Sequence, residues 1–112
     1  MNFKELAENL YLEEDEYLEL LELFLETGAA DLKKCLAAIA AGDAAQAAGA
    51  IHTFKGSSGN MGLTELYEAA IAAENDIKNS ELEQGAQKLE PMLKKMEDLD
   101  ALVRARNSAL SI

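Results

Sequence analysis

The sequence predicts an all-α protein, an antiparallel four-helix bundle with a short extra N-terminal helix. Ala, Leu, Glu and Lys are abundant, while the chain has one proline and no tryptophan, a composition that favours helices over sheets. Apolar residues recur at the 3.6-residue period of an amphipathic helix along most of the chain. A length of 112 residues fits one domain with one core, so we expect a single domain over 1–112.

The first half of the chain is predicted to form two helices. A short amphipathic helix covers about 2–9. A long helix follows over about 13–41, and the helix dipole favours the acidic residues at its first turn. Its apolar stripe consists of Leu18, Leu21, Leu25, Leu32, Cys35, Leu36 and Ile39. Gly28 also lies on this stripe, but the phase does not change across it, so we expect one continuous helix.

Glycines and polar residues mark the boundaries of the next two helices. Gly42 can end the long helix in a left-handed cap, and Asp43 can cap the N-terminus of the next helix. That third helix covers about 44–60. The apolar pattern breaks again around 60–62, and a fourth helix covers about 63–78. Such short connections favour antiparallel neighbours.

The last helix is predicted to begin after the loop with the sequence KNSELE and to run to about 107. Ser80 and Glu83 have the spacing of a capping box at its start. Pro91 lies inside the helix and should kink it, because proline removes a backbone donor. The apolar stripe of this helix consists of Leu89, Leu93, Met96, Leu99 and Val103.

Charge and cysteine content exclude several classes of function. The formal net charge of −11 argues against nucleic acid and against anionic membrane surfaces as partners, because both attract clustered Lys and Arg. The single cysteine, Cys35, is expected to be a small core residue, and it excludes an internal disulfide. The sequence has no signal peptide, no lipidation motif and no apolar run of about 18 residues. We therefore expect a cytoplasmic protein.

Residues 52–62 read HTFKGSSGNMG and combine the only histidine with three of the seven glycines. On a helical wheel, the core face of this helix consists of Ala47, Ala50, Phe54 and Met61. His52 points away from that face. Its own side of the helix carries Ala45, Ala48, Gly49, Gly56 and Gly59. Each glycine costs a helix about 1 kcal/mol relative to alanine, so this bare strip indicates an imidazole that another molecule can approach closely.

Each residue of the motif also has a simpler interpretation. A lone histidine is more often an ordinary surface or core residue, but neither explains the small residues around His52. Lys55 alone would be a solvated lysine, whereas one turn from His52 it can supply positive charge to an anion on the ring. Ser57 is expected towards the core with Ser58 flanking it, so both should bond to the backbone rather than act as nucleophiles. One histidine and no paired ligand spacing argue against a metal site.

An exposed imidazole with a nearby cation suits a phosphoryl carrier. A neutral ring nitrogen can attack a phosphoryl group in line, and the protein then needs little beyond positioning and charge neutralisation. Because no metal site is expected in this chain, its partner would supply both Mg²⁺ and the aspartate that exchanges the phosphoryl group.

This motif, inside an all-helical chain, resembles the histidine-containing phosphotransfer (HPt) domains of bacterial multistep phosphorelays. The resemblance implies that His52 is phosphorylated and that Lys55 lies near the phosphoryl group. It implies that Gly56 leaves room for phosphorylation and for docking of a receiver domain. By spacing it points to Glu74, either as the residue that orients the imidazole or as an ordinary surface acid. The remaining candidates for the docking face are Ala45, Ala48, Gly49 and Gly59.

The resemblance implies response-regulator receiver domains and a hybrid histidine kinase as partners, with no cofactor in this chain. The chemotaxis kinase has a similar phosphotransfer domain, but it usually carries a second histidine where this chain has Ile71. We expect a monomeric carrier without kinase activity, phosphorylated on the outer nitrogen Nε2 of His52. The alternatives are a helical adaptor that binds partners without phosphotransfer, and a domain of the chemotaxis type.

Overall fold

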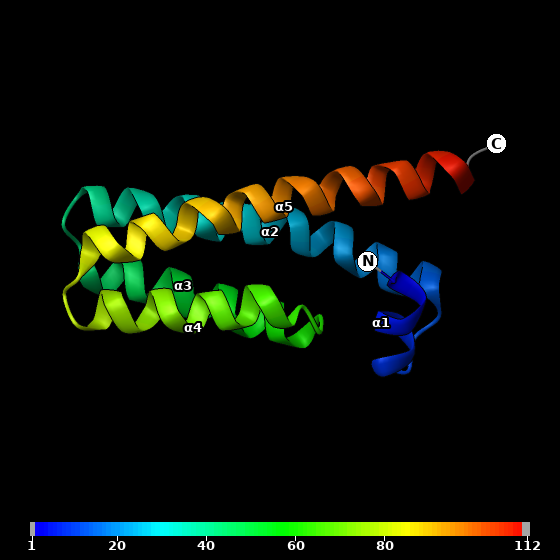
Figure 1. Cartoon of the computed structure of the whole chain (residues 1–112), viewed down its shortest axis with the longest axis horizontal. Helices are drawn as coiled ribbons and strands as arrows, with labels where there is room; N and C mark the ends of the chain where they lie inside the picture. Colours follow the sequence, from blue (N-terminus) through cyan, green and yellow to red (C-terminus); the bar gives the residue numbers. More distant parts are fainter. Residues whose placement is uncertain (1, 111–112) are drawn as a thin grey trace.

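The computed structural model describes residues 2–110, which form five helices and no strand, as the all-α prediction requires (Figure 1). The helices are α1 Phe3–Asn9, α2 Glu14–Ala40, α3 Ala44–Asn60, α4 Thr64–Lys78 and α5 Leu82–Leu110. The predicted boundaries agree with these to within one residue from the first helix to the fourth, and α5 extends three residues beyond the predicted end. No helix within the described residues is long and apolar enough to cross a membrane.

The four longer helices contact one another in a ring. α2 packs against α3, α3 against α4, α4 against α5, and α5 against α2. α2 and α5 extend together beyond the ends of α3 and α4, and α1 packs against α2 near this extension (Figure 1). One side of the molecule is therefore formed by α3 and α4, and the opposite side by α2 and α5.

The core between these helices is closely packed. The rings of Phe24 on α2 and Phe54 on α3 are tilted, with their centroids 5.6 Å apart. Gly28 lies in the middle of α2, which is continuous across it as predicted. A Cβ at Gly28 would lie 2.9 Å from Cε of Met96 and 3.1 Å from Cε2 of Phe54. The absence of a side chain at Gly28 therefore lets α3 and α5 approach α2 closely.

The helix ends confirm one predicted cap and contradict another. Gly42 has a φ of +73°, and the Asp43 carboxylate accepts a hydrogen bond of 3.0 Å from the Gln46 backbone, as expected. The capping box predicted at Ser80 is wrong, because α5 begins only at Leu82 and Ser80 has a φ of +62°. An N-cap residue needs an extended backbone, whereas Ser80 adopts the left-handed conformation that reverses the chain.

α5 is one continuous helix from end to end, with Pro91 inside it. At its C-terminal part it is tied to α2 by an ion pair between Arg106 and Glu14, 2.7 Å apart. Tyr17 of α2 is fully buried, and its hydroxyl donates a hydrogen bond of 2.7 Å to the carbonyl oxygen of Met61. This bond fixes the turn between α3 and α4 against α2.

Candidate functional site

The site is built on the outer face of α3. The core face carries buried Ala47, Ala50 and Phe54, as the wheel predicted, and the His52 side chain is 67% exposed on the other side. α3 contains no acidic residue, and Lys55 is its one permanently charged side chain. In a chain with a net charge of −11, α3 itself therefore adds no negative charge that would repel an anion.

Glu74 of α4 connects the two ionisable residues of α3. Its side chain is only 5% exposed, and its two carboxylate oxygens have different partners. Oε2 lies 2.9 Å from Nδ1 of His52, and Oε1 lies 2.7 Å from Nζ of Lys55. Nζ of Lys78, one turn further along α4, lies 3.6 Å from Oε2. Glu74 is therefore a buried acid in direct contact with His52, and not an ordinary surface acid.

The surroundings of Glu74 favour its ionised form. Burial by itself raises the pKa of this carboxyl, because it removes water from the charge. The hydrogen bonds from Lys55 and His52, together with the charges of Lys55 and Lys78, outweigh burial and hold the pKa below its ordinary value of 4.5. An ionised carboxylate can only accept hydrogen bonds, so the contact with His52 requires Nδ1 to carry a proton. In the neutral ring, Nε2 then holds the free lone pair.

The small residues around His52 differ in their surroundings. Ala45, Gly49 and Gly56 are exposed, and Ala48 is half-buried. A Cβ added at Gly49 or Gly56 would meet no atom within 4 Å, so the packing of this chain requires neither glycine. Gly59 is also exposed, but a Cβ there would lie 3.0 Å from the Tyr67 ring. Its small size therefore accommodates α4.

A hollow of about 430 Å³ lies directly beside this strip. Lys55 and Gly56 line it at the end nearest His52, and the ring of Tyr67 forms part of its wall. Polar side chains of Asn60 and Thr64 also line it. The molecular surface next to His52 is thus concave towards the turn between α3 and α4.

The structure reverses the expected positions of the two serines. Ser58 is completely buried, whereas Ser57 is half-buried, because the core face of α3 is centred closer to Ser58 than the wheel assumed. Both hydroxyls donate to backbone carbonyls of α3, as predicted. Ser57 bonds to the carbonyl oxygen of Phe54 at 3.1 Å and Ser58 to that of Lys55 at 3.1 Å. In these hydrogen bonds the partner of each hydroxyl is a backbone carbonyl and not a side chain that could act as a base.

Two further predictions concern cysteine chemistry and metals. Cys35 is fully buried, as expected for a core residue, and burial raises the pKa of its thiol to about 11. The described residues contain no group of three or more His, Cys, Asp or Glu side chains arranged to hold a metal ion. Lys78 was not predicted as part of the site, although its spacing of four residues from Glu74 placed it on the same face of α4.

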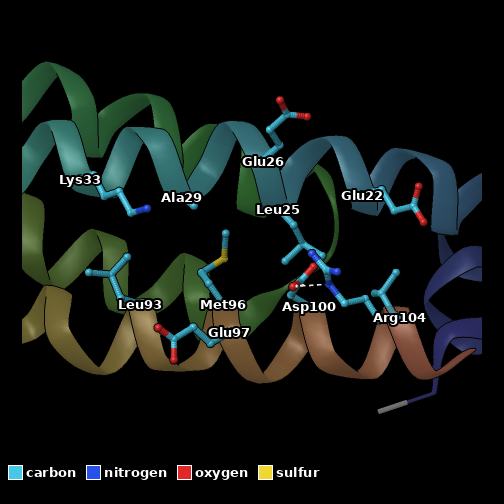
Figure 2. A pocket seen from close by; sticks show the side chains of 11 residues that line it. Glu22, Leu25, Glu26, Ala29, Lys33, Leu93, Met96, Glu97, Asp100 and Arg104 are labelled. Carbon is cyan, nitrogen blue, oxygen red and sulfur yellow. Dashed lines mark hydrogen bonds and ion pairs between the residues drawn. The ribbon is translucent and has the colours of Figure 1, made fainter. Parts of the chain in front are cut away.

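A larger groove, of about 630 Å³, lies between α2 and α5 (Figure 2). Apolar side chains form its floor, including Leu25 and Met96, and charged side chains such as Glu26 and Glu97 stand at its edges. Because α2 and α5 form the side opposite α3 and α4, this groove is separate from the His52 site.

A comparison with protein families gives a match that covers most of the chain. The model of the Hpt domain family matches residues 19–107, a span that includes His52, Lys55 and Glu74. No curated protein and no solved structure matches the chain. Hpt domains are phosphoryl carriers in phosphorelays, where they typically interact with receiver domains and kinases. Together with the helical fold, the match shows that this chain belongs to the Hpt domain family.

Proposed function

We propose that the protein accepts a phosphoryl group on His52 from a receiver-domain aspartyl phosphate and passes it to the aspartate of another receiver. The observation that carries this proposal is the pairing of an exposed imidazole with a buried carboxylate. His52 is 67% exposed, while the Glu74 oxygen 2.9 Å from Nδ1 comes from a side chain that is 5% exposed. One ring nitrogen is held by the protein, and the other is open to a partner.

The geometry supports Nε2 as the phosphorylated atom. The lone pair of Nε2 attacks the phosphorus in line and forms the N–P bond, while the bond from phosphorus to the aspartyl oxygen breaks and its electrons remain on the aspartate. Nδ1 keeps its proton throughout, so the ring becomes cationic. The Glu74 carboxylate, which accepts from Nδ1, stabilises that charge. Glu74 in this way orients the ring and favours the phosphorylated form.

Lys55 and Gly56 are proposed to assist this transfer. The Lys55 side chain is 24% exposed and only one turn from His52, so its ammonium group can turn towards a phosphoryl group on the ring. Gly56 is exposed and has no internal contact that requires glycine, which is consistent with a need for space outside the chain.

The proposed partners are response-regulator receiver domains and a hybrid histidine kinase. We infer that they dock on the strip formed by Ala45, Ala48, Gly49 and Gly59. The receiver supplies Mg²⁺ and the reacting aspartate, and this chain contributes no kinase activity. A monomer in the cytoplasm, folded as an antiparallel four-helix bundle with its extra N-terminal helix, is consistent with this role, and the ring of helix contacts supports that arrangement.

The test is phosphoryl transfer from a panel of phosphorylated receiver domains to the wild type and to His52→Gln. We expect label on the wild type alone, stable in base and labile in acid. Glu68→Gln, a change of another exposed side chain, controls for loss of folding. If no receiver of the source organism labels the folded wild type, the helical adaptor becomes the better explanation.

A further inference from the structure

The buried Glu74 carboxylate has two lysines beside it, and they differ in distance and freedom. Lys55 Nζ lies 2.7 Å from Oε1, whereas Lys78 Nζ lies 3.6 Å from Oε2. The Lys78 side chain is 60% exposed, compared with 24% for Lys55. The carboxylate therefore has one close cation and one looser cation, and they approach different oxygens.

Phosphorylation of His52 would place a second anion within reach of Lys55. A phosphoryl group carries a charge of about −1.5 to −2 near neutral pH and has strong acceptor oxygens, so it competes with Glu74 for the Lys55 ammonium. When Lys55 leaves, Oε1 loses its close charged partner, while Oε2 keeps its contact with Nδ1 of the ring. Leaving a buried oxygen without its partner is costly.

We propose, on the basis of the function proposed above, that Lys78 is a positioning residue for the phosphorylated state. When Lys55 turns from Glu74 to the phosphoryl group, Lys78 closes on the carboxylate and replaces Lys55 as its ammonium partner, beside the cationic ring. No proton moves in this exchange, because both ammonium groups stay charged and only the ion pairs change.

The structure favours Lys78 for this role on three grounds. Among the described residues, the ion pairs of Glu74 are with His52, Lys55 and Lys78 only. Lys78 and Glu74 are four residues apart on α4, so rotation of the lysine side chain is sufficient to bring them together. The distance of 3.6 Å between Lys78 Nζ and Glu74 Oε2 is longer than a close charged hydrogen bond, so Lys78 can still move nearer to the carboxylate.

The experiment compares Lys78→Gln with a matched control, Lys94→Gln. Lys94 also forms an exposed i,i+4 ion pair, with Asp98 at 3.1 Å on α5, so both variants lose one positive charge and one such pair. Each protein is phosphorylated by phosphoramidate, a small donor that needs no docking, and then equilibrated with a receiver that exchanges label with the wild type. The readout is the partition of label between His52 and the receiver aspartate.

We expect Lys78→Gln to shift the partition about two- to fivefold towards the receiver, the range for a partly exposed ion pair. Lys94→Gln should match the wild type, and Lys78→Arg should restore the partition. Before labelling, Lys78→Gln and Lys94→Gln should have similar melting temperatures, because each loses one exposed i,i+4 ion pair and Lys55 remains the close cation of Glu74.

Two results would overturn the role of Lys78 while leaving the carrier function intact. One is an equal partition for Lys78→Gln and Lys94→Gln with a normally labelled wild type. The other is a loss of stability in Lys78→Gln that is as large before labelling as after it, which would make Lys78 a constant structural cation. A wild type that takes label from neither donor would instead reject the phosphotransfer function, and this inference with it.

Discussion

The buried carboxylate of Glu74 lies 2.9 Å from Nδ1 of the exposed His52. The contact joins α3 and α4 across residues that are 22 positions apart in the chain. Because the pKa of Glu74 is held below its ordinary value, the carboxylate accepts and the ring donates. The protein thereby selects one tautomer of a side chain that is otherwise open to solvent.

Replacing Glu74 by glutamine should remove the preference of His52 for the tautomer with the proton on Nδ1. A glutamine amide can both donate and accept, so it holds either tautomer, and it cannot stabilise a cationic ring as a carboxylate does. We expect phosphoryl transfer to His52 to slow by about tenfold, the loss that corresponds to one charged hydrogen bond. Nitrogen NMR of ¹⁵N-histidine protein gives the tautomer directly, since His52 is the only histidine.

The matched control for this change is Glu68→Gln, which removes an exposed carboxylate from the same helix. Its spectrum should show the wild-type tautomer, with the proton on Nδ1, and its transfer rate should be unchanged. If Glu74→Gln also left both the tautomer and the rate unchanged, the contact would have no part in preparing the ring.

The same carboxylate should make stability depend on pH in the acid range. Folding lowers the pKa of Glu74 from 4.5, so the ionised group stabilises the folded state in full above pH 4.5. This stabilisation is lost as the pH falls from 4.5 through the lowered pKa, because the unfolded chain binds the proton first. Denaturant unfolding of the wild type should therefore lose free energy with falling pH more steeply than unfolding of Glu74→Gln.

The chain has 21 acidic residues, so the prediction rests on the comparison between variants. Glu68→Gln should retain the wild-type slope below pH 4.5, because Glu68 is exposed and is not among the residues that interact with Glu74. Equal slopes for the wild type and Glu74→Gln would mean that the lysines and His52 do not stabilise the ionised carboxylate.

Gly56→Ala should raise stability and impair function at once. A Cβ at Gly56 meets no atom of the chain, so alanine should stabilise the helix by about 0.5–1 kcal/mol. The added methyl group would stand one turn from His52 on the approach of a receiver, so transfer from a receiver should slow. Urea unfolding and transfer kinetics measure the two effects separately; unchanged transfer would remove the functional reason for this glycine.

Gly28→Ala should have the opposite effects, a loss of stability with no change in the transfer rate. Its Cβ would lie 3.1 Å from Cε2 of Phe54, a buried ring that cannot easily move, so we expect a net loss of about 1 kcal/mol from overpacking. The transfer rate should stay at the wild-type value under conditions where the variant is folded. A more stable Gly28→Ala would show that Met96 and Phe54 yield without cost.

Local signals predicted the helices and the position of His52, but not the contacts between helices. Gly42 and Asp43 gave the start of α3 because a left-handed glycine and an N-cap act within a few residues. The same kind of signal failed at Ser80, where the chain reversal determined the backbone conformation. The contact of Glu74 depends on the register of α4 against α3, which spacing in one sequence does not determine; only the family resemblance pointed to it.

Cys35 should be unreactive in the folded protein and report on unfolding. Its thiol is fully buried, donates to the carbonyl oxygen of Ala47 at 3.4 Å, and has a pKa raised from 9.0 to about 11. Because the thiolate is the reactive form, a maleimide should label this cysteine only as fast as the protein opens. The raised pKa also means that stability is retained below pH 9.0 and falls as the pH rises towards 11, since the unfolded chain loses the proton first. Gly28→Ala should therefore label faster than the wild type and Gly56→Ala more slowly, and labelling at the rate of a free thiol would contradict the burial of Cys35.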